Sequence, residues 1–126
     1  MGKTLIDATN PMGLDDAGRI VSTVASGTTL GSHTAALLPQ THVVRAFTHV
    51  MEELLDNRGC TQPLFWAMAI AADDSTAVTL VADLVRATGF TPVLIGGLAT
   101  SAALEPGGSL FPHMFTPGDL KSILAL

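Results

Sequence analysis

The chain is poor in cysteine, in aromatic side chains and in positive charge, and each shortage excludes a class of protein. Its 126 residues include one cysteine, one tryptophan and no tyrosine. A lone cysteine excludes an internal disulfide bond, which favours a reducing compartment, and we expect the cytoplasm. Six Lys and Arg residues stand against eleven Asp and Glu residues, which gives a net charge of -5. Without a basic stripe to meet a phosphate backbone, nucleic acid is not an expected partner.

Long hydrophobic runs and metal-binding patterns are also missing. The longest apolar run, over residues 63–72, stops at Asp73 and has the length of a strand rather than of a membrane span. The first residues lack the apolar segment of a signal peptide. The four histidines are dispersed, and no pair has the spacing of a zinc motif. We therefore expect a soluble protein with neither a membrane partner nor a metal site.

What the chain does contain is an alternation of strand and helix patterns in a length that suits one domain, which we assign to residues 1–126. Gly89, followed by Phe90, is expected to end the longest helix in a Schellman motif. The expected elements, in chain order, are a strand over 3–8, a loop over 12–32, a helix over 33–38 capped by Ser32, a strand over 41–47, a helix that Thr48 or His49 opens and that ends near 57–59, a strand over 64–72, a helix over 75–88 capped by Asp73 or Asp74, a strand over 91–95, and a short last helix capped by Thr116.

This order predicts an α/β fold, which is partly Rossmann-like and has a mostly parallel sheet of about four strands flanked by helices. The strand over 64–72 is apolar on both faces, as is typical of a parallel strand covered by helices above and below. The strand from Lys3 to Ala8 has the character of an interior strand, yet nothing upstream of it supplies a neighbour. An exposed apolar edge invites pairing, so we expect a homodimer or a partner chain to cover it.

The candidate binding residues follow three of the predicted strands. Open α/β sheets bind their ligands at the carboxyl ends of strands, and glycines let a backbone approach a flat ring. Each group also has a structural interpretation. Asn10 and Pro11 can be a strand-ending turn, Phe47 can belong to the core, and the glycines at 96 and 97 can form a tight turn. Asp73 and Asp74 precede a helix, which favours capping over catalysis. The candidates are Asn10 and Pro11, Phe47 and Thr48, and Gly96, Gly97 and Leu98.

Several short motifs, in their order and spacing, resemble one family over most of residues 3–106. The chain resembles the NADP oxidoreductases that use a deazaflavin coenzyme, together with their ferric-reductase relatives. In that family a first βαβ unit carries Gly-x-Gly-x-x-Gly, and none of the 12 glycines makes that pattern after a strand here. The resemblance is therefore to the family's C-terminal half. The motifs are Asp7-Ala-Thr-Asn-Pro11, Leu38-Pro39, Val43-Val-Arg-Ala-Phe47, Ala72-Asp-Asp74, Gly89-Phe-x-Pro-Val93 and Leu104-Glu-Pro106.

The resemblance implies hydride transfer between NADPH and a deazaflavin or flavin-like ring, with NADP(H) and that ring as cofactors. It places Asn10 and Pro11 where the two rings of the family meet. The cofactors carry the reactivity, so no acid-base set is required and the catalytic residues stay unassigned. The chain departs from the family at Thr48, where Asn is usual, at Ala72, where Gly is usual, and at 95–98. The alternatives are a non-catalytic oligomerising or small-ligand-binding module, and a truncated fragment that needs a separate N-terminal half.

Overall fold

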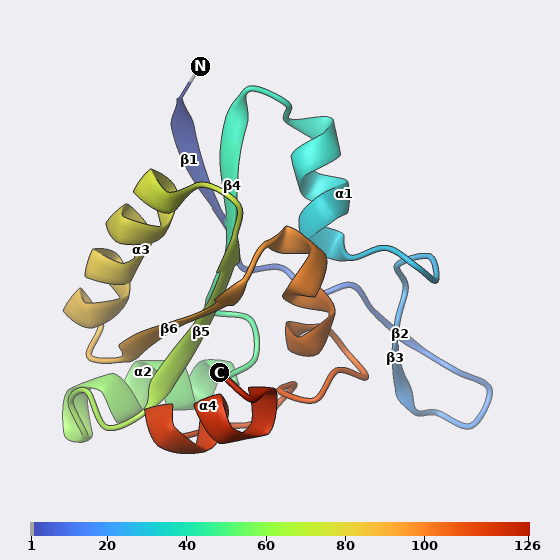
Figure 1. Cartoon of the computed structure of the whole chain (residues 1–126). Coiled ribbons are helices and arrows are strands. Elements are labelled where there is room, and N and C mark those ends of the chain that lie inside the picture. The colour runs from blue at the N-terminus through green and yellow to red at the C-terminus, as the bar shows by residue number, and fades with distance from the viewer. Residues whose placement is uncertain (1) are drawn as a thin grey trace.

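The fold is built on a four-stranded sheet with helices on both faces (Figure 1). It is known from a computed structural model that describes residues 2–126. The strands are β1 (Lys3–Asp7), β4 (Thr41–Arg45), β5 (Ala67–Ala72) and β6 (Thr91–Gly96), in the spatial order β1-β4-β5-β6. Two of the three pairings are parallel. The predicted class, a Rossmann-like α/β fold with a mostly parallel sheet of four strands, is confirmed.

One strand direction differs from the expectation. β5 is parallel to β6 but antiparallel to β4, through the pairs Val44 with Ala72 and Arg45 with Ala71. The prediction of parallel neighbours rested on the apolar character of β5, and all six of its residues are indeed buried. Burial on both faces, however, shows only that other elements cover the strand, and it does not indicate the direction of the strand. As a result, the carboxyl ends of β1 and β4 point one way and that of β6 points the other way.

Alternate residues of β5 build two cores on the two faces of the sheet. Met68 and Ile70 pack with α3 (Ser75–Ala87) and Phe90, and residues of α2 (Glu52–Thr61) pack against the same cluster. On the other face, Ala69 and Ala71 pack with Leu104, at the end of the 3₁₀ helix η1 (Leu98–Leu104), and with α4 (Pro117–Leu124). Because β5 is covered on both sides, it forms the centre of the fold.

The predicted loop over 12–32 contains structure that the sequence did not indicate. A short hairpin, β2 (Met12–Leu14) with β3 (Ile20–Ser22), stands away from the sheet in Figure 1. Helix α1 (Leu30–Leu37) begins earlier than expected, because the side chain of Thr29, not that of Ser32, caps it and accepts the Ser32 backbone N–H at 3.1 Å. Both are favoured capping residues, so the sequence alone cannot choose between them.

The second helix also starts later than predicted. α2 begins at Glu52, with no side-chain cap, and it continues to Thr61 rather than ending near 57–59. Thr48 and His49, one of which was expected to open this helix, are instead buried in the connection from β4. Acidic residues at both of the first two helical positions favour the observed start.

Other helix ends agree with the sequence. Asp74 caps α3 through the Ala77 N–H at 2.8 Å. Gly89 has a φ of +90° and, with Phe90, makes the two backbone hydrogen bonds of a Schellman motif. Thr116 caps α4 through the Asp119 N–H at 3.3 Å. Among residues 2–126, no helix has the length and apolar character that crossing a membrane requires.

Candidate functional site

A crevice of about 400 Å³ opens where the chain leaves β1 and β4. The loop after β1 supplies Asn10, and the connection after β4 supplies Phe47 and Thr48. Three of the predicted binding residues therefore meet in one place, beside a largely apolar wall. The remaining lining residues are Ala8, Met12, Val50, Met51, Glu52, Leu55, Phe111 and Pro112.

A side-chain amide joins the two loops of the crevice. Asn10 Nδ2 donates a hydrogen bond to the Thr48 carbonyl oxygen at 3.1 Å, although the two residues are 38 positions apart in the chain. This bond fixes which end of the amide faces Thr48, because only the nitrogen can donate to a carbonyl. Asn10 Oδ1 and Thr48 Oγ1 are buried without a hydrogen-bond partner. An unmatched buried polar atom costs about 1–3 kcal/mol, so each such atom needs a structural or functional explanation.

Phe47 occupies a strained backbone conformation at this crevice. Its φ is +60°, in the left-handed region that large side chains rarely adopt. Outliers of this kind cost about 1–3 kcal/mol and cluster at ligand sites, where the surrounding structure holds them. The conformation ends β4 at Arg45, earlier than the expected strand end at Phe47, and it brings the Phe47 side chain to the crevice wall.

Beneath the crevice, a buried arginine holds the loop that carries Asn10. Arg45 has no exposed surface, and its Nη1 donates to the carbonyl oxygens of Asp7 at 2.9 Å and Thr9 at 2.6 Å. The same nitrogen lies 3.3 Å from Asp7 Oδ1. Burial opposes ionisation of Asp7, but hydrogen bonds from Thr9 and Thr34 and the charge of Arg45 outweigh it, so the pKa of Asp7 is lowered. Asp7 therefore stays ionised and the ion pair persists.

A second buried carboxylate acts on Arg45 through its charge. Burial lowers the pKa of Arg45, and the charges of Asp7 and Glu105 oppose that shift. Glu105 is 3% exposed, accepts the Leu30 N–H at 3.0 Å at the start of α1, and accepts the Ser101 hydroxyl at 2.8 Å. Sequence reasoning gave no role to Arg45 or Glu105 beyond the resemblance. The available signal was a charged residue within an apolar strand, because such a residue needs a partner of opposite charge elsewhere in the chain.

His49, next to Thr48, fixes the segment that carries Phe111 and Pro112. Its ring is fully buried, Nε2 accepts the Ala69 N–H at 3.1 Å, and Nδ1 lies 2.9 Å from the His113 carbonyl oxygen. Since Nε2 accepts, Nδ1 carries the proton and donates to that carbonyl, so the ring is neutral. Burial lowers the pKa of His49 from its usual 6.5, and the bond to His113 opposes the shift only in part.

Because His49 is buried in its neutral form, we expect the free energy of unfolding to fall in acid. Below about pH 6.5 the unfolded chain takes up a proton that the folded chain excludes. The free energy of unfolding should therefore fall as the pH drops below that value, and the contribution of His49 to it should be complete above that value. Denaturant unfolding between about pH 7.5 and pH 5 measures the slope, which reaches at most about 1.4 kcal/mol per pH unit for one group. We expect His49→Gln to flatten the slope, whereas His33→Gln, at an exposed position of α1, should keep it. An unchanged slope in His49→Gln would contradict this assignment.

The other predicted binding residues lie elsewhere. Gly96 ends β6, and the first N–H of η1, that of Leu98, donates to Asp73 Oδ1 at 2.9 Å. The Leu98 carbonyl oxygen accepts the Thr29 hydroxyl at 2.8 Å. Neither Pro11 nor any of Gly96, Gly97 and Leu98 lines the crevice. The reversed direction of β6 explains the separation, and ligand contact by these residues stays a prediction.

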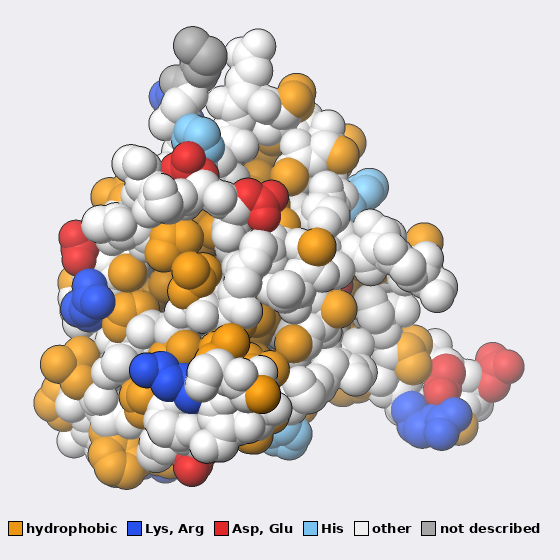
Figure 2. Space-filling view, in the orientation of Figure 1, with side chains coloured by type: hydrophobic (Ala, Val, Ile, Leu, Met, Phe, Trp, Pro, Cys, Tyr) orange, Lys and Arg blue, Asp and Glu red, His pale blue; other side chains and the backbone are white. Residues whose placement is uncertain are grey.

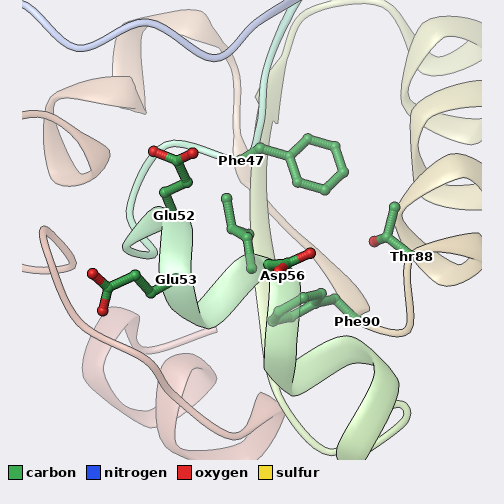
Figure 3. Close-up of a pocket in the computed structure, with 7 residues that line it drawn as sticks. Phe47, Glu52, Glu53, Asp56, Thr88 and Phe90 are labelled. Atoms are coloured by element: carbon green, nitrogen blue, oxygen red, sulfur yellow. The ribbon is translucent and has the colours of Figure 1, made fainter.

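A larger cavity of about 680 Å³ adjoins the crevice and shares Phe47, Glu52 and Leu55 with it. Figure 3 shows the Phe47 ring between α2 and Thr88, with Phe90 below. Three carboxylates, on Glu52, Glu53 and Asp56, surround this cavity, and no basic residue lines it. We place the candidate site in the smaller crevice, because Asn10 and Thr48 line it together with Phe47. Two of the four unpartnered buried side-chain atoms belong to Asn10 and Thr48, and the other two are Nε and Nη2 of Arg45.

The charge of the surface is consistent with this placement. Figure 2 shows Lys and Arg side chains as isolated groups, not as a stripe, on the face in view. Neither cavity contains a Lys or Arg residue that could bind a pyrophosphate. Within residues 2–126, no three His, Cys, Asp or Glu side chains come together as a possible metal site. The crevice therefore fits an uncharged ligand better than an anion.

Comparison with solved structures shows the class of fold. The chain superposes on a putative F420-dependent NADP reductase from Arthrobacter sp. FB24 with a TM-score of 0.71 and 21% identity, over 79% of this chain and 46% of that one. A hypothetical protein from Sinorhizobium meliloti gives a TM-score of 0.70 and 24% identity, over 90% of this chain and 54% of that one. The chain thus has the fold of part of these proteins and spans about half of their length. No protein-family model and no curated protein sequence matches it.

Proposed function

We propose that the crevice binds the flat ring of a redox cofactor, and that the chain acts as the second half of an NADP-dependent oxidoreductase. The reaction would be hydride transfer between NADPH and a deazaflavin or flavin-like ring. The observation that carries the proposal is the crevice of Asn10, Phe47 and Thr48, set at the carboxyl ends of β1 and β4 in a fold shared with a putative F420-dependent NADP reductase.

The residues that line the crevice fit the planar ring of such a cofactor. Phe47, Phe111, Met12 and Met51 give apolar surface for a planar ring, and Asn10 and Thr48 give polar atoms at its edge. When bound, the nicotinamide and the deazaflavin supply the hydride chemistry. The chain's own contribution is to orient a ring and to keep water away from it, and Arg45 and His49 hold the two loops that do so.

The residues do not fit the pyrophosphate of the nucleotide. The cavities beside the ring site carry Glu52, Glu53 and Asp56 and no cation, so a phosphate there would meet only negative charge. We infer that another polypeptide segment holds the pyrophosphate. β1 is an edge strand of the sheet, and Leu5 on it is 37% exposed. A dinucleotide-binding half, or a second copy in a homodimer, can pair there, and a monodisperse monomer at micromolar concentration would contradict the homodimer.

The experiment is a fluorescence titration of the purified chain with NADPH, using the nucleotide emission and Trp66 as reporters. We expect saturable binding that weakens roughly tenfold in Asn10→Ala, because the substitution removes the bond between the two loops. Asn57→Ala, at an exposed position of α2, is the matched control and should bind like the parent chain. Absence of binding up to millimolar NADPH would reject ring binding by this chain alone and would favour the non-catalytic module or the half that needs its partner.

A further inference from the structure

We propose that the cavity of about 680 Å³ beside α2 is a docking groove for a basic segment of a partner protein, in which lysines or arginines alternate with apolar residues. The groove runs between α2 and the turn that joins α3 to β6, where Thr88 lines it (Figure 3). This surface is separate from the ring contacts of the proposed function, so either proposal can fail while the other stands.

One side of the groove is apolar. Phe47, Leu55 and Phe90 line it, and all three belong to or pack against the core cluster on the α3 face of the sheet. Phe90 is 1% exposed, whereas Phe47 and Leu55 are only partly buried. Their open surface faces the groove, so an apolar side chain placed there removes hydrophobic surface from water on both partners.

The other side is acidic and has no compensating charge. Glu52, Glu53 and Asp56 are exposed and line the groove together with no Lys or Arg. Within residues 2–126, the ion pairs involve other carboxylates, and none includes these three. The helix dipole accounts for acidic residues in the first turn of α2, but Asp56 lies beyond that turn. Glu52 and Asp56, four positions apart, repel each other, and a cationic partner relieves that repulsion.

The spacing of the carboxylates fits a segment with more than one cation. Glu52 and Asp56 are separated by about 6 Å along the helix, at about 1.5 Å per residue. In an extended peptide, side chains on one side recur about every 6.6 Å, so two cations at alternate positions match this separation. The residue between them points to the opposite side, where an apolar side chain can cover the rings. The net charge of -5 also favours the approach of a basic partner.

A second copy of this chain does not supply such a segment. Arg45 is fully buried, Arg19 pairs with Asp15, and Arg86 pairs with Asp83. Figure 2 shows the Lys and Arg side chains of the face in view as isolated groups. The three basic residues outside these pairs lie on three different elements, β1, α2 and α4, and they are Lys3, Arg58 and Lys121.

The test compares three capped pentapeptides and one polyamine by NMR titration of the labelled chain. Lys-Leu-Lys-Leu-Lys carries both features, Lys-Gly-Lys-Gly-Lys keeps only the charge, and Glu-Leu-Glu-Leu-Glu reverses it. Spermidine has the same charge as the first two without a peptide backbone. The variants are Asp56→Asn and Asp56→Lys, and the matched controls are Asp83→Asn and Asp83→Lys, at an exposed carboxylate of α3 outside the groove.

We expect Lys-Leu-Lys-Leu-Lys to bind saturably and to shift the amides of Phe47, Asp56 and Thr88. Lys-Gly-Lys-Gly-Lys and spermidine should bind at least roughly tenfold more weakly, because they leave the rings exposed to water. Asp56→Asn should weaken the first peptide roughly two- to fivefold, as is usual for one exposed ion pair, and Asp56→Lys by more than roughly tenfold. The two Asp83 variants should bind like the parent chain.

Several results would overturn the proposal. Equal binding of Lys-Gly-Lys-Gly-Lys or spermidine would reduce the groove to an acidic patch without an apolar contact. Binding of Glu-Leu-Glu-Leu-Glu as tight as that of its basic counterpart would remove the role of the carboxylates. Equal losses in the Asp56 and Asp83 variants would show that the peptide follows net charge rather than the groove, and no saturation at millimolar peptide would leave no docking site.

Discussion

Arg45→Met is expected to lower the free energy of unfolding by about 3–5 kcal/mol, the range for breaking a buried ion pair from one side. The substitution leaves the Asp7 carboxylate buried without its cation, and it leaves the carbonyl oxygens of Asp7 and Thr9 without the Nη1 donor. It also removes the charge that balances Glu105. Urea unfolding monitored through Trp66 fluorescence measures the loss.

The matched control is Arg86→Met. Arg86 pairs with Asp83 at 3.0 Å on the surface of α3, where both side chains are more than half exposed. Exposed pairs of this kind contribute about 0–1 kcal/mol, so the control should unfold close to the parent chain. Equal effects of the two substitutions would show that the Arg45 network does not stabilise the fold. A large effect at Arg45 alone would support its role in holding the loop that carries Asn10.

Gly89→Ala is expected to lower the free energy of unfolding by about 2–5 kcal/mol, for two reasons that add. Gly89 has a φ of +90°, where a side chain costs about 1–2 kcal/mol. In addition, a Cβ at this position would lie 2.2 Å from the Gly59 carbonyl oxygen, and such overpacking costs about 1–3 kcal/mol. The close approach of Gly59 and Gly89 seats the end of α2 on the turn between α3 and β6, so the substitution should loosen α2 and the cavity beside it.

Gly118→Ala is the control for this glycine. It lies in the first turn of α4, and a Cβ there would meet nothing within 4 Å. Alanine favours a helix over glycine by up to about 1 kcal/mol, so this variant should be as stable as the parent or slightly more stable. Denaturant midpoints of the two variants measure the difference. If Gly89→Ala unfolded like Gly118→Ala, the contact between α2 and the turn would not constrain the fold.

The sequence predicted those parts of the fold that depend on local patterns. The helix over α3 and its Schellman ending at Gly89 are set by residues that are neighbours in the chain, so their spacing is sufficient. The cap was predicted as Asp73 or Asp74, and the structure selects Asp74. The α/β class followed in the same way from the alternation of elements. The hairpin of β2 and β3 was not predicted, because strands of three residues are too short to show a periodicity.

The features that the sequence did not indicate depend on distant contacts. The antiparallel pairing of β4 with β5 is one example, since an apolar strand has the same pattern in either direction. His49 is another, because its ring is fixed by backbone groups of Ala69 and His113 and not by any neighbour. For the site, Asn10, Phe47 and Thr48 meet in the crevice as expected for strand ends, whereas Gly96 to Leu98 follow a strand that runs the other way.

The central claim is that a redox ring binds in the crevice of Asn10, Phe47 and Thr48. Its most direct test is an NMR map of the isotope-labelled chain titrated with NADPH. The account predicts that the backbone amides of these three residues shift and saturate together. Shifts confined to Gly96, Gly97 and Leu98, or no shifts at saturating nucleotide, would contradict it.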